Sequence, residues 1–247
     1  MIIDVHMHLW GDHESTKSEI LKVCERHDVR KTFISTLLGT LQQPNEEEIR
    51  TGNDITYRFM KSAPSLIKGL AYLNPLNDNC ADELKRRIED EGMSGIKIWV
   101  ATQCDNPHVD IIADLAIKYD IPILIHAFYK KMGFLPGESR GFHVRNLAKR
   151  YPELKIIMAH LGSNVYDSIK CIKDCPNVYT DFSGSMYRRD DLDYTISHIG
   201  TGRVLFGSDF PGTFENCIGQ VLGADISDDQ RQDIFYKNAA KLFKLDI

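Results

Sequence analysis

Short aliphatic and β-branched runs alternate with stretches of helical periodicity along the whole chain, and this alternation constrains the fold more than any other feature. The runs predict eight strands, at residues 2–8, 29–37, 67–74, 95–100, 122–127, 155–161, 177–183 and 203–209. The stretches predict helices at about 16–27, 46–62, 80–91, 108–119, 140–151, 164–174, 189–199 and 227–244. Such alternation indicates parallel strands joined by crossover helices.

The length of 247 residues matches a single (β/α)8 barrel, which typically needs about 250 residues. We therefore predict an α/β fold, a TIM barrel formed by residues 1–247 as one domain. An open doubly wound sheet is the alternative architecture. A nucleotide-binding sheet of that kind would carry a glycine-rich turn after its first strand, and here that strand ends His6-Met7-His8-Leu9-Trp10.

Charge and composition narrow the partners to small molecules. The formal net charge of −5 argues against bulk nucleic-acid binding, which needs clustered cations. No apolar run approaches the roughly 20 residues that span a membrane. Because Met1 leads directly into a strand and the six cysteines are scattered, we expect a cytoplasmic protein with free thiols. A thiolate metal site at Cys171 and Cys175 is a minor alternative, since no second ligand pair follows.

Polar side chains collect at the ends of the predicted strands. Strands 1, 5, 6 and 8 end with four of the nine histidines and one aspartate: His6, His8, His126, His160 and Asp209. Alternation along a strand predicts that these side chains face the barrel axis, where catalytic residues of such barrels lie. The same parity predicts helix-facing side chains at Ile3, Val5, Met7, Ile123, Ile125, Ile157, Ala159, Val204 and Phe206.

A metal ion explains this convergence better than packing does. A single histidine at a strand end is usually a structural, hydrogen-bonded residue. Burying four imidazoles and a carboxylate together is costly unless a cation satisfies them. Imidazole nitrogen and carboxylate oxygen suit Zn²⁺, and also Fe²⁺, Co²⁺ or Mn²⁺.

Lys97 is a further inward candidate, on strand 4. Near a metal it would bind a substrate anion, or lose its proton and react. The structural alternative pairs it with a carboxylate such as Asp181, which shares the inward face of strand 7 with Ser183.

Six motifs in order make the chain resemble the amidohydrolase superfamily, in its amidohydrolase-related branch of metal-dependent hydrolases and decarboxylases. They are I-D-V-H-M-H (3–8), G-I-K-I-W (95–99), I-L-I-H-A (123–127), M-A-H-L-G (158–162), F-G-S-D-F-P (206–211) and N-A-A-K-L-F (238–243). The resemblance implies that His6, His8, His126 and Asp209 bind one divalent metal, for which Zn²⁺ is the first candidate. The resemblance is also compatible with a homodimer.

The resemblance also assigns catalytic roles. His160, beside the metal-bound water, would act as a base or an orienting residue together with Asp209. In binuclear relatives the His160 position binds a second metal, and a carboxylated lysine on strand 4 bridges the two ions. Lys97 stands on strand 4, so a second metal follows if it is carboxylated. Trp99 stands where mononuclear relatives often carry a histidine.

Substrate contacts are expected from strand ends and from the loop 128–142. Lys97 and Arg140 would hold a substrate carboxylate, and the loop that contains Arg140 could close as a lid or be merely a solvated basic loop. Trp99 would line an apolar pocket together with Trp10, Phe128 and Tyr187.

We expect hydrolysis of an amide, ester or lactone in a small carboxylated molecule, because family decarboxylases tend to be longer than this chain. The alternative is non-oxidative decarboxylation of an aromatic or unsaturated acid, which uses the same ligands. A metal-dependent deoxyribonuclease would favour a glutamate on strand 4, and a purely structural metal site would not need both His160 and Asp209.

Overall fold

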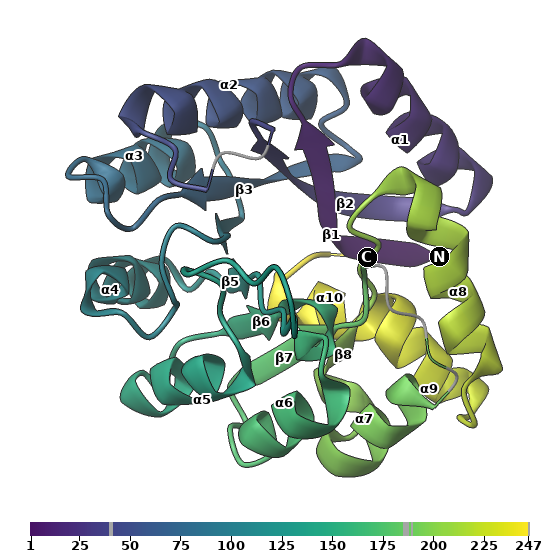
Figure 1. The fold of residues 1–247 in the computed structure, drawn as a ribbon. Helices are drawn as coiled ribbons and strands as arrows, with labels where there is room; N and C mark the ends of the chain where they lie inside the picture. The colour runs from purple at the N-terminus through teal and green to yellow at the C-terminus, as the bar shows by residue number, and fades with distance from the viewer. Residues whose placement is uncertain (40–41, 185–187, 189, 247) are drawn as a thin grey trace.

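The computed structural model describes residues 1–39, 42–184, 188 and 190–246, and within them eight strands form one parallel sheet in sequence order (Figure 1). The strands are β1 (Ile2–Trp10), β2 (Val29–Leu37), β3 (Ile67–Leu73), β4 (Gly95–Ile98), β5 (Ile123–Ile125), β6 (Ile156–Met158), β7 (Val178–Asp181) and β8 (Val204–Leu205). A doubly wound sheet reverses its strand order part-way, so the alternative architecture is wrong.

Helices surround the curled sheet on its outer side (Figure 1). They are α1 (Glu14–Arg26), α2 (Glu46–Ser62), α3 (Cys80–Lys85), α4 (Asp110–Tyr119), α5 (Gly141–Arg150), α6 (Val165–Ile172), α7 (Asp191–Ile199), α8 (Phe214–Gly223), α9 (Asp228–Gln232) and α10 (Asn238–Leu242). Among the described residues, no helix combines the length and the apolar character that a membrane span requires.

The first strand also meets the segment that follows the last one. The backbone N–H of Val5 donates to the carbonyl of Phe206 (3.0 Å), and that of His8 donates to the carbonyl of Asp209 (3.1 Å). A parallel bridge joins Met7 to Asp209. The predicted architecture is therefore confirmed as an α/β, TIM-barrel-like fold of eight parallel strands.

Two details of the helices differ from the prediction. Helix α8 was not predicted, because Gly219 and Gly223 weaken its helical pattern and Pro211-Gly212 precede it as a turn signal. The predicted final helix 227–244 is divided into α9 and α10 by a π-helical turn at Asp233–Lys237.

The core consists of a layer between sheet and helices and a smaller interior cluster. The interior cluster joins side chains of β1, β2, β3, β5, β6 and β8 to α10: Ile3, Val5, Phe33, Leu70, Leu124, Ile157, Ala159, Leu205, Ala239 and Leu242. Phe33 stacks on Phe243 directly after α10, with ring centroids 3.8 Å apart. Helix α10 therefore covers one end of the curled sheet.

This packing corrects the predicted side-chain directions in two strands. Ile3 and Val5, like Ile157 and Ala159, lie in the interior rather than against helices, whereas Met158 packs in the helix-facing layer. The pairing of β1 with β2 shifts between Asp4 and Met7, which resets the alternation before His6 and His8.

In the segment after β6, a left-handed backbone rather than strand parity directs the histidine. β6 ends at Met158, and His160 has φ of 62°. In β5, and at Val204 and Phe206 in and after β8, the predicted helix-facing residues do pack in the outer layer.

Candidate active site

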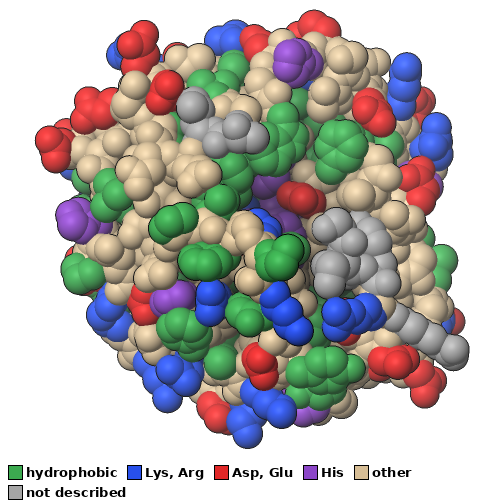
Figure 2. Space-filling model, viewed as in Figure 1, with side chains coloured by type: hydrophobic (Ala, Val, Ile, Leu, Met, Phe, Trp, Pro, Cys, Tyr) green, Lys and Arg blue, Asp and Glu red, His purple; other side chains and the backbone are tan. Residues whose placement is uncertain are grey.

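His6, His8 and Asp209 meet at the ends of β1 and β8. The Nε2 atoms of His6 and His8 lie 2.9 Å apart, and Asp209 Oδ1 lies 3.4 Å from the first and 3.6 Å from the second. Figure 2 shows a hollow in this face of the molecule with histidine and acidic side chains within it. The three residues form a group that could hold a metal ion.

The hydrogen bonds of the two histidines determine which nitrogens carry protons. His6 Nδ1 donates to Asp181 Oδ2 (2.9 Å), and His8 Nδ1 donates to the carbonyl of Ser35 (3.2 Å). Burial, with the charge of Lys97, lowers the pKa of His8 well below its usual value, so the ring is neutral. Two unprotonated Nε2 atoms therefore face each other, an arrangement that a cation between them would stabilise.

The spacing of the donor atoms fits such a cation. Ligands about 2.0–2.1 Å from a tetrahedral ion stand roughly 3.3–3.4 Å from one another. The separations of 2.9, 3.4 and 3.6 Å in this group bracket that value. The residues present therefore fit a divalent metal with nitrogen and oxygen ligands.

His126 and His160 form a second facing pair. His126 Nε2 donates to Glu138 Oε1 (2.9 Å), His160 Nδ1 donates to the carbonyl of Ser183 (3.1 Å), and the two remaining nitrogens lie 3.2 Å apart. Burial lowers the pKa of His126 to about 3, so its ring is neutral. The structure thus places His126, expected as the fourth metal ligand, beside His160 and outside the group formed by His6, His8 and Asp209.

Two buried carboxylates near the site were missed by the sequence prediction. Glu138, in the loop before α5, binds both His126 and the ammonium group of Lys130 (2.9 Å each). Asp4 accepts hydrogen bonds from the backbone N–H groups of His6 (3.0 Å) and Ser208 (3.2 Å), and burial raises its pKa to about 7. Asp4 shares the parity of His6 and His8 in the sequence, whereas no periodicity marks Glu138.

Lys97 lies buried against the first group. Its Nζ is 3.1 Å from His6 Nε2, and burial lowers its pKa to about 8, although Asp209 and Asp181 act in the opposite direction. Among the described residues Lys97 has no carboxylate within ion-pair distance. The predicted structural alternative, a pair with Asp181, is therefore not formed.

Asp181 instead orients the histidines. It accepts from His6 Nδ1, from the backbone N–H of His160 (3.1 Å) and from the hydroxyl of Ser183 (2.6 Å). Burial alone would raise its pKa, but His6 and His160 lower it, so the group is a carboxylate. Its oxygens keep the proton of His6 on Nδ1.

Replacing Asp181 with asparagine should lower the affinity for a divalent metal by about 10–100-fold, the usual cost of losing a partner that orients a ligand. Competition with a chromophoric chelator for Mn²⁺ or Zn²⁺ measures this affinity. Asp174→Asn, outside the site, is the control and should bind as the unmodified chain does. Equal metal affinities for the Asp181 and control variants would contradict the role of Asp181 in orienting a metal ligand.

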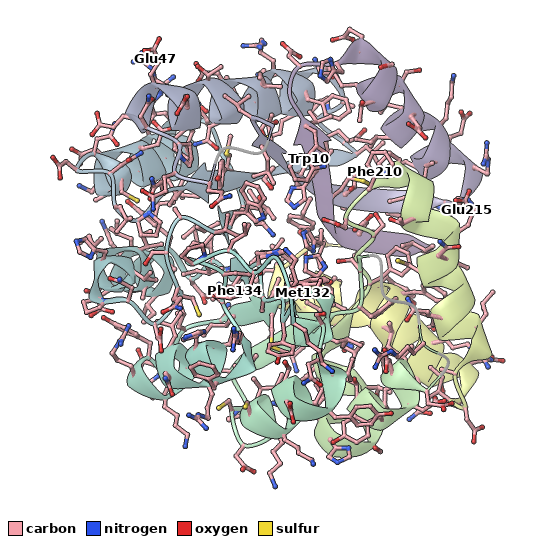
Figure 3. The ribbon with its side chains drawn as sticks, in the orientation of Figure 1. Trp10, Glu47, Met132, Phe134, Phe210 and Glu215 are labelled. Carbon is pink, nitrogen blue, oxygen red and sulfur yellow. The ribbon has the colours of Figure 1, made fainter. Side chains whose placement is uncertain are left out.

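The predicted aromatic wall is present in part. Trp10 meets Trp99 edge to face, with centroids 5.8 Å apart, and Trp99 lies 6.4 Å from His126. Phe128 stacks on His126 with centroids 5.9 Å apart. Figure 3 shows Trp10 and Phe210 on one side of the hollow and Met132 and Phe134 on the other. Tyr187 lies outside the described residues.

Arg140 contacts two aromatic side chains of its own loop. Its guanidinium lies over the rings of Tyr129 (4.9 Å) and Phe134 (5.9 Å). It lines a cavity of about 140 Å³ together with Asp167 and Cys171. Its contacts therefore stabilise the loop around it.

Left-handed backbone conformations occur at both catalytic candidates. His160 has φ of 62° and Asp209 has φ of 69°, and Leu161 and Ser163 follow His160 with the same sign. Non-glycine residues in this region cost roughly 1–3 kcal/mol each and cluster at functional sites. Both side chains contact histidines of the site, His160 at 3.2 Å from His126 and Asp209 at 3.4 Å from His6.

Comparison with known proteins finds one matching family and several similar proteins. A model of the amidohydrolase family matches residues 3–245. Gamma-resorcylate decarboxylase of Polaromonas sp. is 27% identical in an alignment 254 positions long, gaps included, that covers 81% of this chain and 77% of that protein. The Rhodococcus jostii protein of the same name is 24% identical in an alignment 289 positions long, gaps included, that covers 92% of this chain and 87% of that protein.

A solved structure agrees in fold. Dihydroxybenzoic acid decarboxylase from Polaromonas sp., with bound manganese and the inhibitor 2-nitroresorcinol, superposes with a TM-score of 0.78 at 19% identity. The match covers 99% of this chain and 97% of that one.

The expectation of a hydrolase is wrong. The named relatives are decarboxylases, which supports the alternative reaction. The prediction rested on chain length, which says nothing about the bond that is broken.

Proposed function

Since this chain belongs to the amidohydrolase family, whose model matches residues 3–245, we propose that it is a divalent-metal-dependent decarboxylase of an aromatic or unsaturated carboxylic acid. The observation that carries the proposal is the group of His6, His8 and Asp209 in a chain whose named relatives are decarboxylases. We also infer a closed (β/α)8 barrel from the hydrogen bonds between β1 and residues 206–209.

His6, His8 and Asp209 would hold the ion. His126, expected from the sequence as a fourth ligand, lies outside this group and would have to move toward it to bind through Nδ1, the nitrogen left unprotonated by its bond to Glu138. The bound ion would supply positive charge for the oxygens of the substrate. Manganese in a relative's structure supports a divalent ion, and the donor set equally suits the Zn²⁺ expected from the sequence.

Decarboxylation breaks the bond between a carbon atom and the departing carboxylate, and the electron pair stays on that carbon. A proton must then be delivered to the same carbon as carbon dioxide leaves. Asp209 is the member of the group best placed to do so, since its side chain is 30% exposed while those of His6 and His8 are 0% and 3% exposed. Asp209 would take the proton from solvent or substrate and return it to the carbon.

The remaining residues would bind and orient the substrate. Lys97, with a pKa of about 8, is mainly an ammonium at neutral pH and can hold an anionic oxygen. Trp99 would pack against the substrate's apolar part, and His160 would orient the reacting groups. Arg140 has no place in this proposal, because it contacts Tyr129 and Phe134 instead.

Carbon dioxide release tests the proposal directly. Protein loaded with Mn²⁺ or Zn²⁺ is incubated with 2,6-dihydroxybenzoate, 5-carboxyvanillate and related hydroxybenzoates, and evolved carbon dioxide is measured. We expect release with at least one acid and its loss after removal of the metal by a chelator. Turnover of lactones or esters by the same preparation, with no carbon dioxide from any acid, would refute a decarboxylase.

A further inference from the structure

A second cavity opens beside the candidate active site. Its volume is about 500 Å³, within the range of small-molecule sites. The segments that follow β5, β6 and β7 line it, with Phe128, Tyr129, Lys130, Lys131, Ser163, Asn164 and Arg188. The cavity therefore lies on the face that carries the metal group.

The charge of this cavity is positive. Three of its lining residues are cations, and none is acidic. Lys130 pairs with the buried Glu138 at 2.9 Å, so part of its charge is neutralised. Lys131 and Arg188 have no carboxylate within ion-pair distance in the part of the chain that the structure describes. Figure 2 shows basic side chains gathered beside the central hollow.

Another surface cavity serves as a comparison, because its cations pair with acidic side chains of its own lining. A cavity of about 440 Å³ is lined by Lys17 and Arg58, but Asp12 and Glu14 line it too. Asp12 forms ion pairs with both cations, at 2.8 Å from Arg58. Among the described residues that line the cavity at Lys131 and Arg188, none is such an acidic partner. Burial raises the pKa of the nearby Asp191 and the charge of Arg188 lowers it, but Asp191 does not line the cavity, so the positive charge there is available to a ligand.

One aromatic ring connects the basic cavity to the catalytic histidines. Phe128 lines the cavity, stacks on His126 and meets His160 edge to face with centroids 5.6 Å apart. The ammonium of Lys130 lies 5.3 Å from the centroid of the same ring. A planar substrate that reaches from the metal group past Phe128 would therefore extend one end into the basic cavity.

We propose that this cavity binds a second anionic group of the substrate, through Lys131 and Arg188, while the reacting carboxylate lies at the metal group. The substrate class is then an aromatic or unsaturated acid with two anionic groups. This inference rests on the proposed decarboxylase function for the position of the reacting carboxylate.

Binding of matched probes to the metal-loaded protein tests the cavity without turnover. The probes are isophthalate and terephthalate, each beside its monomethyl ester, which differs from the diacid by one charge. We expect at least one diacid to bind about 10-fold more tightly than its ester at low salt, since its second carboxylate can form charge-assisted hydrogen bonds that the ester cannot. Titration calorimetry gives the dissociation constants.

The double variant Lys131→Ala, Arg188→Ala should bring diacid and ester to within about twofold of each other and leave the ester's affinity unchanged. Lys118→Ala, an exposed lysine at the end of α4, is the matched control and should keep the preference. The inference is overturned if unmodified protein does not prefer either diacid, or if the double variant keeps the preference.

Two results separate this inference from the proposed function. If the preference depends on Lys131 and Arg188 but no acid releases carbon dioxide, the decarboxylase proposal fails and the anion site stands. If carbon dioxide is released and no diacid is preferred, the anion site fails alone.

Discussion

Replacing Asp209 with asparagine is expected to lower kcat by about 10²–10⁴-fold, the usual contribution of a positioned proton-transfer group. Burial alone would raise the pKa of Asp209, but His160, His6, His8 and Lys97 lower it to about 2. The group is therefore a carboxylate that can accept a proton before it returns one. Asparagine keeps the shape and one oxygen but cannot carry that proton.

Initial rates of carbon dioxide release measure this effect, and metal content is determined on the same preparations. If the variant loses activity but keeps its full metal content, Asp209 transfers the proton. If it loses both activity and metal, the result assigns Asp209 only the role of a metal ligand. Asp229→Asn, whose side chain is 90% exposed on α9, is the control. An Asp209 variant that keeps more than a tenth of kcat would exclude both roles.

Replacing Arg87 with methionine is expected to lower the free energy of unfolding by about 3–5 kcal/mol, the cost of breaking a buried ion pair from one side. The side chain of Arg87 is fully buried. Its guanidinium binds Glu83 (2.6 Å), Glu91 (2.7 Å) and Asp54 (2.7 Å). The side chains of Glu83 and Glu91 are themselves only 6% and 8% exposed, so they would lose their counter-charge in a poorly hydrated environment.

Urea unfolding followed by circular dichroism measures the loss, provided that the transition stays two-state. The preceding residue supplies a matched control, because Arg86 is 44% exposed and Arg86→Met should cost no more than about 1 kcal/mol. Adding Glu83→Gln to Arg87→Met should recover part of the loss. Equal stability of the Arg86 and Arg87 variants would contradict the account.

The fold was predictable because its signal repeats along the chain. The eight predicted strands correspond to β1–β8, and a shift of a few residues at their ends does not change the topology. The missing element, α8, follows a Pro-Gly turn and contains two glycines, so its packing rather than its propensity makes it helical.

The site was predictable as a set of residue types but less so as a geometry. Strand parity assigned His6 and His160 to the interior, where they do lie. Parity alone does not explain these orientations. A register shift in β1 determines that of His6, and the left-handed backbone of His160 after β6 determines its own. Such local irregularities leave no periodic trace in a sequence. The same holds for Glu138, whose contact with His126 comes from the folding of a loop.

The contact between α10 and the interior cluster has a consequence for biosynthesis. Phe33, Leu124 and Leu205 are buried against Ala239 and Leu242, which the ribosome adds only after all eight strands have been made. Until they emerge, the growing chain must expose these apolar side chains to water or to a chaperone. The interior cluster therefore cannot be completed before α10 has been made. Tethering the nascent chain at about residue 235 should trap it in a protease-sensitive state.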